Sequence, residues 1–375
     1  MRRVTALLLF CVLLSACGTK PAGLGGLQPV ETNVAVGERI FVATSRAPEA
    51  DKAVLFGGKR SASLHFADLT VSVPLNREPG SIKYPSAKPD AAREFAVASV
   101  ALTDDEAVMA AQLRSTLAEK PKGQRSIFIF VHGYNVSFAK GLFSTAQIQR
   151  DYRVRGATMH YSWPSASEAA LYLYDRDSAE FARDGLVRTL KIAEAANPES
   201  IILLAHSMGT FVTMEAMRTL ALKGDNGPAS RMEALVLAAP DIDFDVFQTQ
   251  LAALKTRPKA MIVLVSEKDR ALQISSRLRG GAARVGSGFK KDELTADGLV
   301  VLDVASLTKK GDKLSHSTFA NSDTLIKLVN GGLNLSTLER AASGNPAGLV
   351  GETLGATGGL LSSIVYLPAK AVGAR

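Results

Sequence analysis

Short, unbroken apolar runs alternate with helical stretches along the middle of this chain. Residues 126–131 (SIFIFV) and 201–204 (IILL) carry no charge, which is typical of strands covered on both faces. Between such runs, residues 177–196 and 208–223 repeat apolar positions with the period of a helix. Further apolar runs lie at 158–162, 234–237, 260–265 and 299–304. The alternation predicts an α/β fold with a mostly parallel central sheet and helices on both faces.

The start of the chain has the pattern of a secretory signal. Arg2 and Arg3 precede an apolar run over residues 4–14, and Cys17 ends the sequence Leu-Ser-Ala-Cys. The run is too short to cross a bilayer, which takes roughly 20 residues, so a transmembrane anchor is disfavoured. The ending resembles a bacterial lipobox. We therefore expect residues 1–16 to be a lipoprotein signal peptide and Cys17 to carry the lipid.

Lipidation of Cys17 also predicts where the protein resides. Several acyl chains, such as palmitate, on one cysteine give stable membrane anchoring, whereas a single chain does not. The expected location is the cell envelope, with the membrane as a partner through the lipid. Gly18, rather than Asp, follows the cysteine. In a Gram-negative cell this favours the outer membrane, with the protein facing the periplasm.

Composition divides the chain after the signal into three parts. Residues 17–36 are rich in Gly, Pro and small polar residues and are expected to form a tether. Residues 37–330 form the predicted α/β domain, which opens with strand-like runs at 40–44 and 69–73 and helical spacing at 104–120. Residues 331–375 form a Gly/Ala-rich tail, whose apolar patch at 360–367 could touch a membrane or partner. A tail docked on the domain, or partly disordered, is favoured.

Charge and cysteine content exclude several classes of function. The net charge of +8 falls by two, to +6, when Arg2 and Arg3 are removed; this fits a surface near anionic lipid or an ordinary solvated surface. No Lys/Arg cluster with interleaved aromatic residues is present, so no nucleic-acid partner is expected. Cys11 and Cys17 are the only cysteines, and neither remains as a free thiol. Cysteine catalysis and Cys-ligated zinc are therefore excluded, and neither a metal nor another cofactor is expected.

The segment 203–209 (LLAHSMG) joins a predicted buried strand to a predicted helix, with Ser207 at the junction. A serine in this position, with small residues two before and two after it, is typical of a nucleophile elbow. The usual pattern is G-x-S-x-G, and here Ala205 stands at the first position. Alanine is small enough for the turn. The segment predicts that Ser207 is a catalytic nucleophile.

The chain has five histidines, and chain order distinguishes them as candidate bases. They are His65, His132, His160, His206 and His316. In elbow-type hydrolases the partners follow in the order serine, acid, histidine. Only His316 comes after Ser207, in a polar segment shortly after the last predicted strand. His206 lies inside the elbow, and its side chain is expected to point away from the nucleophile. The order therefore predicts that His316 is the general base.

Three aspartates are candidates for the acid that orients the histidine. Asp269 follows the predicted strand 260–265, in the loop after the next-to-last strand, and is favoured for that reason. Asp241 and Asp243 follow the preceding strand and remain rivals; they could instead cap the loop or support the site. Their spacing does not make a calcium loop, because Val246 and Ala252 stand where Gly and Glu are needed.

An oxyanion hole requires two N–H donors near the nucleophile. The backbone N–H of Met208 directly follows Ser207 and is one candidate. Tyr134 is the second, because His132 and Gly133 end an earlier strand and Gly allows the loop to turn its N–H toward the site. Trp163, the only tryptophan, ends another strand. It could line an acyl pocket or pack beneath the site.

Four segments together resemble a bacterial family of α/β hydrolases. They are residues 130–135 (FVHGYN), 161–164 (YSWP), 205–209 (AHSMG) and 239–243 (APDID). The family is esterase/lipase-like and of unknown function, and the resemblance runs from about residue 39 to about residue 329. It implies an α/β-hydrolase fold with a serine hydrolase triad, and Ala205 looks normal for it. It implies no particular substrate.

Two functions follow as hypotheses. The first is a serine hydrolase anchored in the envelope, cleaving the carboxylic ester bond of a small molecule or lipid. The second is a non-catalytic hydrolase-fold lipoprotein that acts as an interaction module in the envelope. Amidase, thioesterase and acyltransferase chemistry also use this fold, so they stay open within the first hypothesis.

Overall fold

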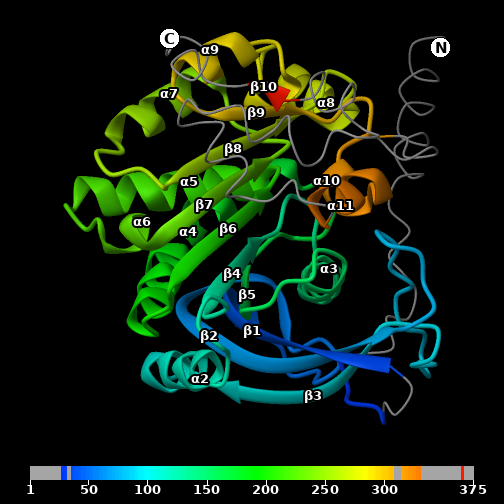
Figure 1. Cartoon of the computed structure of the whole chain (residues 1–375). Coiled ribbons are helices and arrows are strands. Elements are labelled where there is room, and N and C mark those ends of the chain that lie inside the picture. Colours follow the sequence, from blue (N-terminus) through cyan, green and yellow to red (C-terminus); the bar gives the residue numbers. More distant parts are fainter. Residues whose placement is uncertain (1–26, 32–34, 308–313, 331–364, 367–375) are drawn as a thin grey trace, which may run out of the picture.

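The computed structural model of the chain describes residues 27–31, 35–307, 314–330 and 365–366 (Figure 1). One sheet runs through this part of the chain, in the order β10-β9-β8-β7-β6-β4-β5-β1-β2-β3. The strands are β1 (Ala35–Pro48), β2 (Phe56–Pro74), β3 (Ala96–Thr103), β4 (Ser126–Val131), β5 (Ala157–Ser162), β6 (Ser200–His206), β7 (Met232–Ala238), β8 (Ala260–Val265), β9 (Val300–Asp303) and β10 (Val365–Tyr366).

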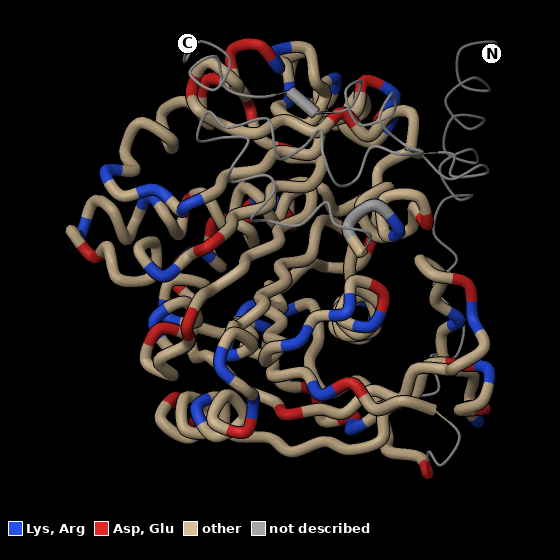
Figure 2. Tube along the Cα trace, in the orientation of Figure 1, with Lys and Arg blue, Asp and Glu red and all other residues tan. Residues whose placement is uncertain are grey.

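The central strands are parallel and the edges are antiparallel. From β9 through β8, β7, β6, β4 and β5 to β1, every neighbouring pair is parallel. The β1–β2, β2–β3 and β9–β10 pairs are antiparallel. Figure 2 shows that charged residues gather on helices and loops, while β4, β5, β6 and β8 carry none. This is the pattern expected of strands buried on both faces.

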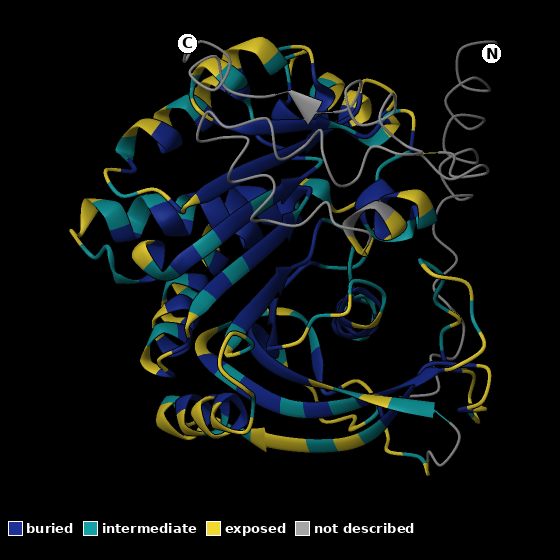
Figure 3. Ribbon diagram, viewed as in Figure 1, coloured by how far each residue is buried: buried dark blue, intermediate teal, exposed yellow. Residues whose placement is uncertain are grey.

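Helices lie on both faces of the sheet. They are α2 (Glu106–Ala118), α3 (Phe138–Asp151), α4 (Tyr172–Ala195), α5 (Met208–Leu222), α6 (Gly227–Arg231), α7 (Phe244–Ala253), α8 (Arg270–Leu278), η2 (Val285–Ser287), α9 (Lys291–Ala296), α10 (Thr318–Asn321) and α11 (Asp323–Asn330). The larger core lies under α2, α4, α5 and α7. Residues of α3, α10 and α11 pack on the opposite face. Figure 3 shows the buried strands between these layers. The predicted mostly parallel sheet with helices on both faces is confirmed.

The N-terminal side of the described chain begins inside the predicted tether. Leu27 is buried in a core with residues of β1, β2 and α3, and its N–H donates to the Ala53 carbonyl at 2.8 Å. The Val30 N–H donates to the Val97 carbonyl at 2.9 Å. Residues 27–31 therefore lie against the domain, and the signal peptide at 1–16 with Cys17 falls outside the described residues. None of the described helices combines the length and the apolar character needed to cross a membrane.

Candidate active site

Ser207 occupies a sharp turn between β6 and α5, at the carboxyl ends of the parallel strands. Its backbone has φ 53° and ψ −126°, a conformation that is rare and strained for a residue with a side chain. The Ser207 N–H donates to the Ala238 carbonyl at 2.9 Å, and the Asp241 N–H donates to the Ser207 carbonyl at 3.3 Å. A strained serine between a strand and a helix is the arrangement expected of a nucleophile elbow.

Two glycines allow the elbow to form against the end of β4. A Cβ atom at Gly209 would lie 2.2 Å from the His132 carbonyl oxygen, which no side chain could tolerate. A Cβ atom at Gly133 would lie 2.8 Å from the Ser207 Cβ. The chain therefore needs glycine at both positions for the elbow and the loop after β4 to approach each other. Ala205, on the strand side, is fully buried.

His316 and Asp269 meet at the same edge of the sheet. The His316 Nδ1 lies 2.7 Å from the Asp269 Oδ2, and the Asp269 side chain is 1% exposed. Asp269 directly precedes α8 and also accepts a hydrogen bond from the Leu272 N–H at 3.0 Å. The Arg270 N–H donates to the Leu314 carbonyl at 3.0 Å, which ties the loop before His316 to the start of α8. Two residues that are 47 positions apart thus form a buried carboxylate–imidazole pair.

His206 connects this pair to the elbow. Its Nε2–H donates to the His316 carbonyl at 3.0 Å, since a carbonyl oxygen can only accept. The rings of His206 and His316 have centroids 4.7 Å apart, and Phe319 packs on His206 at 4.6 Å. Burial, reinforced by the nearby His316, lowers the pKa of His206 well below its usual range. The residue next to Ser207 is therefore a neutral imidazole that positions the backbone of His316.

The two rival aspartates have other partners. The Asp241 carboxylate accepts from the Ser275 hydroxyl at 2.6 Å and the Tyr172 hydroxyl at 3.1 Å. Arg284 also forms a buried ion pair with it at 3.6 Å. Asp243 caps α7 by accepting from two backbone N–H groups in the first turn of that helix. Of the three candidates, Asp269 is the one that the structure brings to His316.

The loop after β4 carries the second proposed oxyanion donor. Tyr134 lies beyond Gly133, and its hydroxyl donates to the Ala169 carbonyl. Burial raises the pKa of the Tyr134 phenol to about 12, with smaller contributions from Asp175 and Tyr172. The side chain is therefore a neutral anchor that fixes the loop, while the backbone N–H is the candidate donor. Met208, the other candidate, is the first residue of α5.

Sequence reasoning missed the two residues that clamp this loop, Arg46 and Asp175. The Asp175 carboxylate accepts from the Asn135 N–H at 3.1 Å and from the Ser165 hydroxyl at 2.5 Å. The buried Arg46 guanidinium donates to the Val136 carbonyl at 2.6 Å. Burial lowers the pKa of Arg46 to about 9 and raises the pKa of Asp175. The backbone on both sides of Asn135 is thus tied to buried polar groups.

Trp163 and the histidines of the neighbouring strands belong to the core. Trp163 is fully buried, stacks on His132 with centroids 4.9 Å apart, and donates its Nε1–H to the His132 carbonyl at 2.7 Å. It therefore packs beneath the site. Burial lowers the pKa of His132 well below its usual range and that of His160 to about 3. Within the described residues, no group of three or more His, Cys, Asp and Glu side chains could hold a metal ion.

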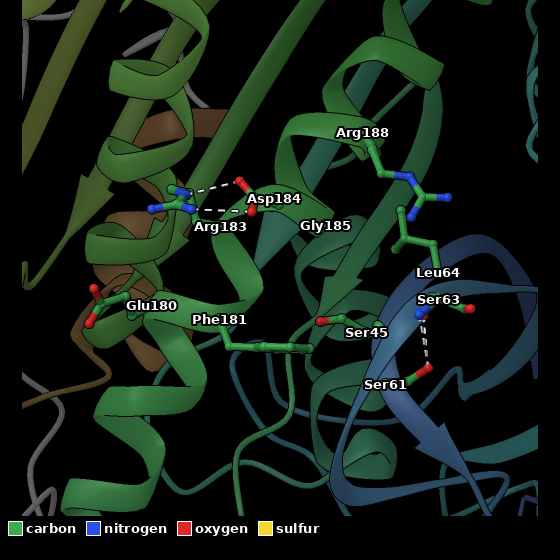
Figure 4. A pocket seen from close by; sticks show the side chains of 11 residues that line it. Ser45, Ser61, Ser63, Leu64, Glu180, Phe181, Arg183, Asp184, Gly185 and Arg188 are labelled. Atoms are coloured by element: carbon green, nitrogen blue, oxygen red, sulfur yellow. Dashed lines mark hydrogen bonds and ion pairs between the residues drawn. The ribbon is translucent and has the colours of Figure 1, made fainter.

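A second serine–histidine–aspartate set joins Ser61 and His65 of β2 to Asp104, which follows β3. The Ser61 Oγ is 3.0 Å from the His65 Nε2, and the His65 Nδ1 is 2.7 Å from the Asp104 Oδ1. Ser61 lines a pocket of about 420 Å³ between the β1–β2 hairpin and α4 (Figure 4). Its hydroxyl also donates to the Ser63 carbonyl at 3.0 Å and accepts from the Ser63 N–H at 3.2 Å, and Figure 4 shows Ser61 turned toward Ser63. This serine sits within a strand, away from any strand-to-helix turn.

Comparison with known proteins identifies a family over most of the domain. The family model described as "Alpha/beta hydrolase of unknown function (DUF900)" matches residues 105–331, more than half of the chain. No curated protein matches the sequence. An esterase of Rhizomucor miehei is 12% identical, over 86% of this chain and 94% of its own, with a TM-score of 0.37. Apo esterase 2 of Thermogutta terrifontis is 13% identical, over 80% of this chain and 93% of its own, with a TM-score of 0.27.

Proposed function

Because the chain belongs to the family of α/β hydrolases that residues 105–331 match, we propose that it is a serine hydrolase that cleaves carboxylic esters. The observation that carries this proposal is the pairing of His316 with the buried Asp269, which His206 ties to the elbow of the strained Ser207. These three residue types, on an elbow and two later loops, are what acyl transfer through a serine requires.

Each residue has a distinct role in the proposed reaction. The Ser207 hydroxyl attacks the ester carbonyl carbon and passes its proton to the Nε2 of His316. Asp269 accepts the hydrogen bond of Nδ1–H and stabilises the imidazolium that forms. The backbone N–H groups of Tyr134 and Met208 donate to the oxyanion. His316 then protonates the departing alcohol, and a water, activated by the same imidazole, releases the acid and regenerates Ser207.

Turnover of p-nitrophenyl esters with acyl chains of graded length tests this proposal. We expect the full chain to hydrolyse at least the short-chain esters, and the Ser207→Ala variant to be inactive. Equal rates for the two proteins would contradict the proposal. If neither protein is active, and a Ser207→Ala strain behaves like wild type while a deletion strain shows a defect, the hydrolase fold serves as an interaction module.

We further propose that lipid on Cys17 anchors the enzyme in the cell envelope. The lipobox-like ending of the signal and the Gly/Pro-rich residues that follow it support this. Partition into a detergent phase tests it. The wild-type protein should enter the detergent phase, and Cys17→Ser should stay in the aqueous phase. A Cys17→Ser protein that partitions like wild type would overturn the anchoring proposal.

A further inference from the structure

An apolar groove of about 570 Å³ runs over one face of the central strands. Phe128 of β4, Ile202 of β6, Val236 of β7 and Ile262 of β8 form its floor, and Leu302 of β9 lies at one side. We call this surface the sheet groove. Along the strands, the side chains that face the other way are fully buried, including Leu203 and Leu235. Ile202 and Val236 are only half-buried. Figure 3 shows that β6 and β7 carry teal, half-buried segments among the dark blue ones.

Phe128, Ile262 and Leu302 are at most 7% exposed, so the incomplete cover is centred on Ile202 and Val236, and it is unusual in the middle of a parallel sheet. Interior strands of this kind are normally covered on both faces, and their sequences are correspondingly apolar. Here α4 and α5 cover one face, while the described parts of α3, α10 and α11 reach only the side of the sheet groove. A contiguous apolar surface of this kind marks a place where something else packs.

The two ends of residues 331–364 indicate that this segment fills the sheet groove. Helix α11 ends at Asn330, which lines the sheet groove. Strand β10 pairs with β9, so that Val365 lies opposite Leu302, which also lines it. Residues 331–364 therefore leave from one side of the sheet groove and return at the other. From β4 to β9 the distance is roughly 20 Å at the usual strand spacing, which 34 residues span with length to spare.

The composition of residues 331–364 fits an apolar surface. The segment contains eight Leu and Ile residues and three charged residues, which are Glu339, Arg340 and Glu352. Over the whole chain 21% of residues are charged, so this segment is poor in charge. A chain segment of low charge and high leucine content gains free energy by burying those side chains.

We propose that residues 331–364 pack on the sheet groove and complete the second layer of the domain. The segment predicted from sequence as a tail is then an integral part of the fold. This inference is independent of the proposed chemistry, because it concerns the face of the sheet and not the carboxyl ends of the strands. It also removes an apolar surface that would otherwise promote aggregation.

Photo-crosslinking in the full chain tests the proposal directly. A benzoylphenylalanine at Val236, in the floor of the sheet groove, should cross-link to peptides within 331–364 of the same molecule. The matched control carries the probe at Leu222, an exposed leucine at the end of α5, and should give no such peptides. Cross-links from position 236 to a second copy or to detergent, or none to 331–364, would overturn the proposal.

A second measurement leaves the sheet unaltered. The double variant Leu360→Asp, Leu361→Asp should lower the Tm by about 5 °C or more and bind an apolar dye, because the proposed packing cannot accept two charges in place of two leucines. The control Ser362→Asp, Ser363→Asp adds the same charge in the same segment and should shift the Tm by about 1 °C or less. Equal Tm shifts for the two variants would contradict the proposal.

Discussion

Two serine–histidine–aspartate sets lie in this molecule, each with 2.7 Å between the histidine Nδ1 and the carboxylate, and their surroundings differ. In the set formed by Asp104, His65 and Ser61, the Asp104 side chain is 75% exposed and the serine lies in a strand. In the other set, the Asp269 side chain is 1% exposed and Ser207 has a strained backbone before a helix. Water screens the first carboxylate, whereas burial strengthens the effect of the second on its histidine.

A chain of hydrogen bonds from serine through histidine to aspartate is therefore not sufficient for an acyl-transfer site. A nucleophile also needs N–H donors aimed at the developing oxyanion, because these supply much of the stabilisation of the transition state. Ser207 has the first N–H of α5 beside it and the clamped loop after β4 within contact, since Gly133 approaches its Cβ. Ser61 instead lies within a strand, and its hydroxyl is engaged by both the carbonyl and the N–H of Ser63.

Removing each serine hydroxyl in turn should give the largest difference between the two sets. We expect Ser207→Ala to lower kcat for p-nitrophenyl butyrate by at least about 10⁴-fold, because the nucleophile is lost. Ser61→Ala should stay within about twofold of wild type. Initial rates of proteins with matched circular dichroism measure both. If Ser61→Ala lost more activity than Ser207→Ala, Ser61 and not Ser207 would be the nucleophile.

Replacing the aspartate of each set is expected to give the second-largest difference in kcat. Asp269→Asn should reduce kcat by about 10³–10⁴-fold, because an amide at this position can stabilise the wrong tautomer of His316 and cannot stabilise its charged form. Asp104→Asn, the matched change in the exposed set, should alter kcat by less than about twofold. Comparable losses of kcat in the two variants would show that the exposure of the carboxylate does not distinguish the two sets.

Loss of the Asp175 carboxylate, which holds the loop after β4, should lower kcat less than loss of Asp269. Asp175→Asn weakens the acceptor of the Asn135 N–H, so the Tyr134 N–H loses its alignment. We expect kcat to fall by about 10²-fold with little change in KM, because the donor acts in the transition state. Asp177→Asn, on an exposed position of the same helix, is the control and should match wild type. A loss that appears in KM alone would argue against this positioning role.

A buried core histidine such as His160 should affect the pH dependence of stability, whereas His316 is expected to act in catalysis. The pKa of His160 is about 3 in the folded protein, while an unfolded histidine titrates near 6.5. The unfolded state therefore binds more protons between these values, and stability falls as the pH drops from about 6.5. Replacing His160 by Gln should flatten that slope by up to about 1.4 kcal/mol per pH unit. Urea unfolding at pH 7, 6, 5 and 4 measures it; an unchanged slope would contradict the argument.

The smallest effect is expected for the exposed ion pair itself. Asp104→Asn removes the partner of His65 at a solvated site, so the free energy of unfolding should change by less than about 1 kcal/mol. Chemical denaturation in low and high salt checks this expectation. A loss above about 2 kcal/mol would mean that the set on β2 has a structural role that its exposure does not suggest.

Much of the fold could be predicted from sequence because its central strands are unbroken apolar runs. The predicted strands at 126–131 and 260–265 have the same bounds as β4 and β8, and family membership supports the expected α/β-hydrolase fold. β3 was missed because it is an edge strand with exposed positions on one face. α3 was missed because it buries polar residues, including Thr145 and Gln147, which obscure its apolar face.

Local motifs and chain order predict part of the candidate site. The elbow motif points to Ser207, and order along the chain points to His316 and favours Asp269; their catalytic roles stay predictions. The sequence alone leaves Asp241 as a rival candidate for the acid. In the structure its carboxylate accepts hydrogen bonds from Tyr172 and Ser275 and forms an ion pair with Arg284. The clamp by Arg46 and Asp175 could not be predicted, because its contacts join residues 90 and 40 positions apart that share no local pattern.

Labelling the full chain with a fluorophosphonate, followed by peptide mapping, tests the central claim most directly. The reagent reacts with a serine only where the hydroxyl is activated and the oxyanion is stabilised. The account predicts one adduct per chain, on Ser207, lost in Asp269→Asn and retained in Asp104→Asn. An adduct on Ser61, or no adduct on Ser207 in the folded protein, would contradict it.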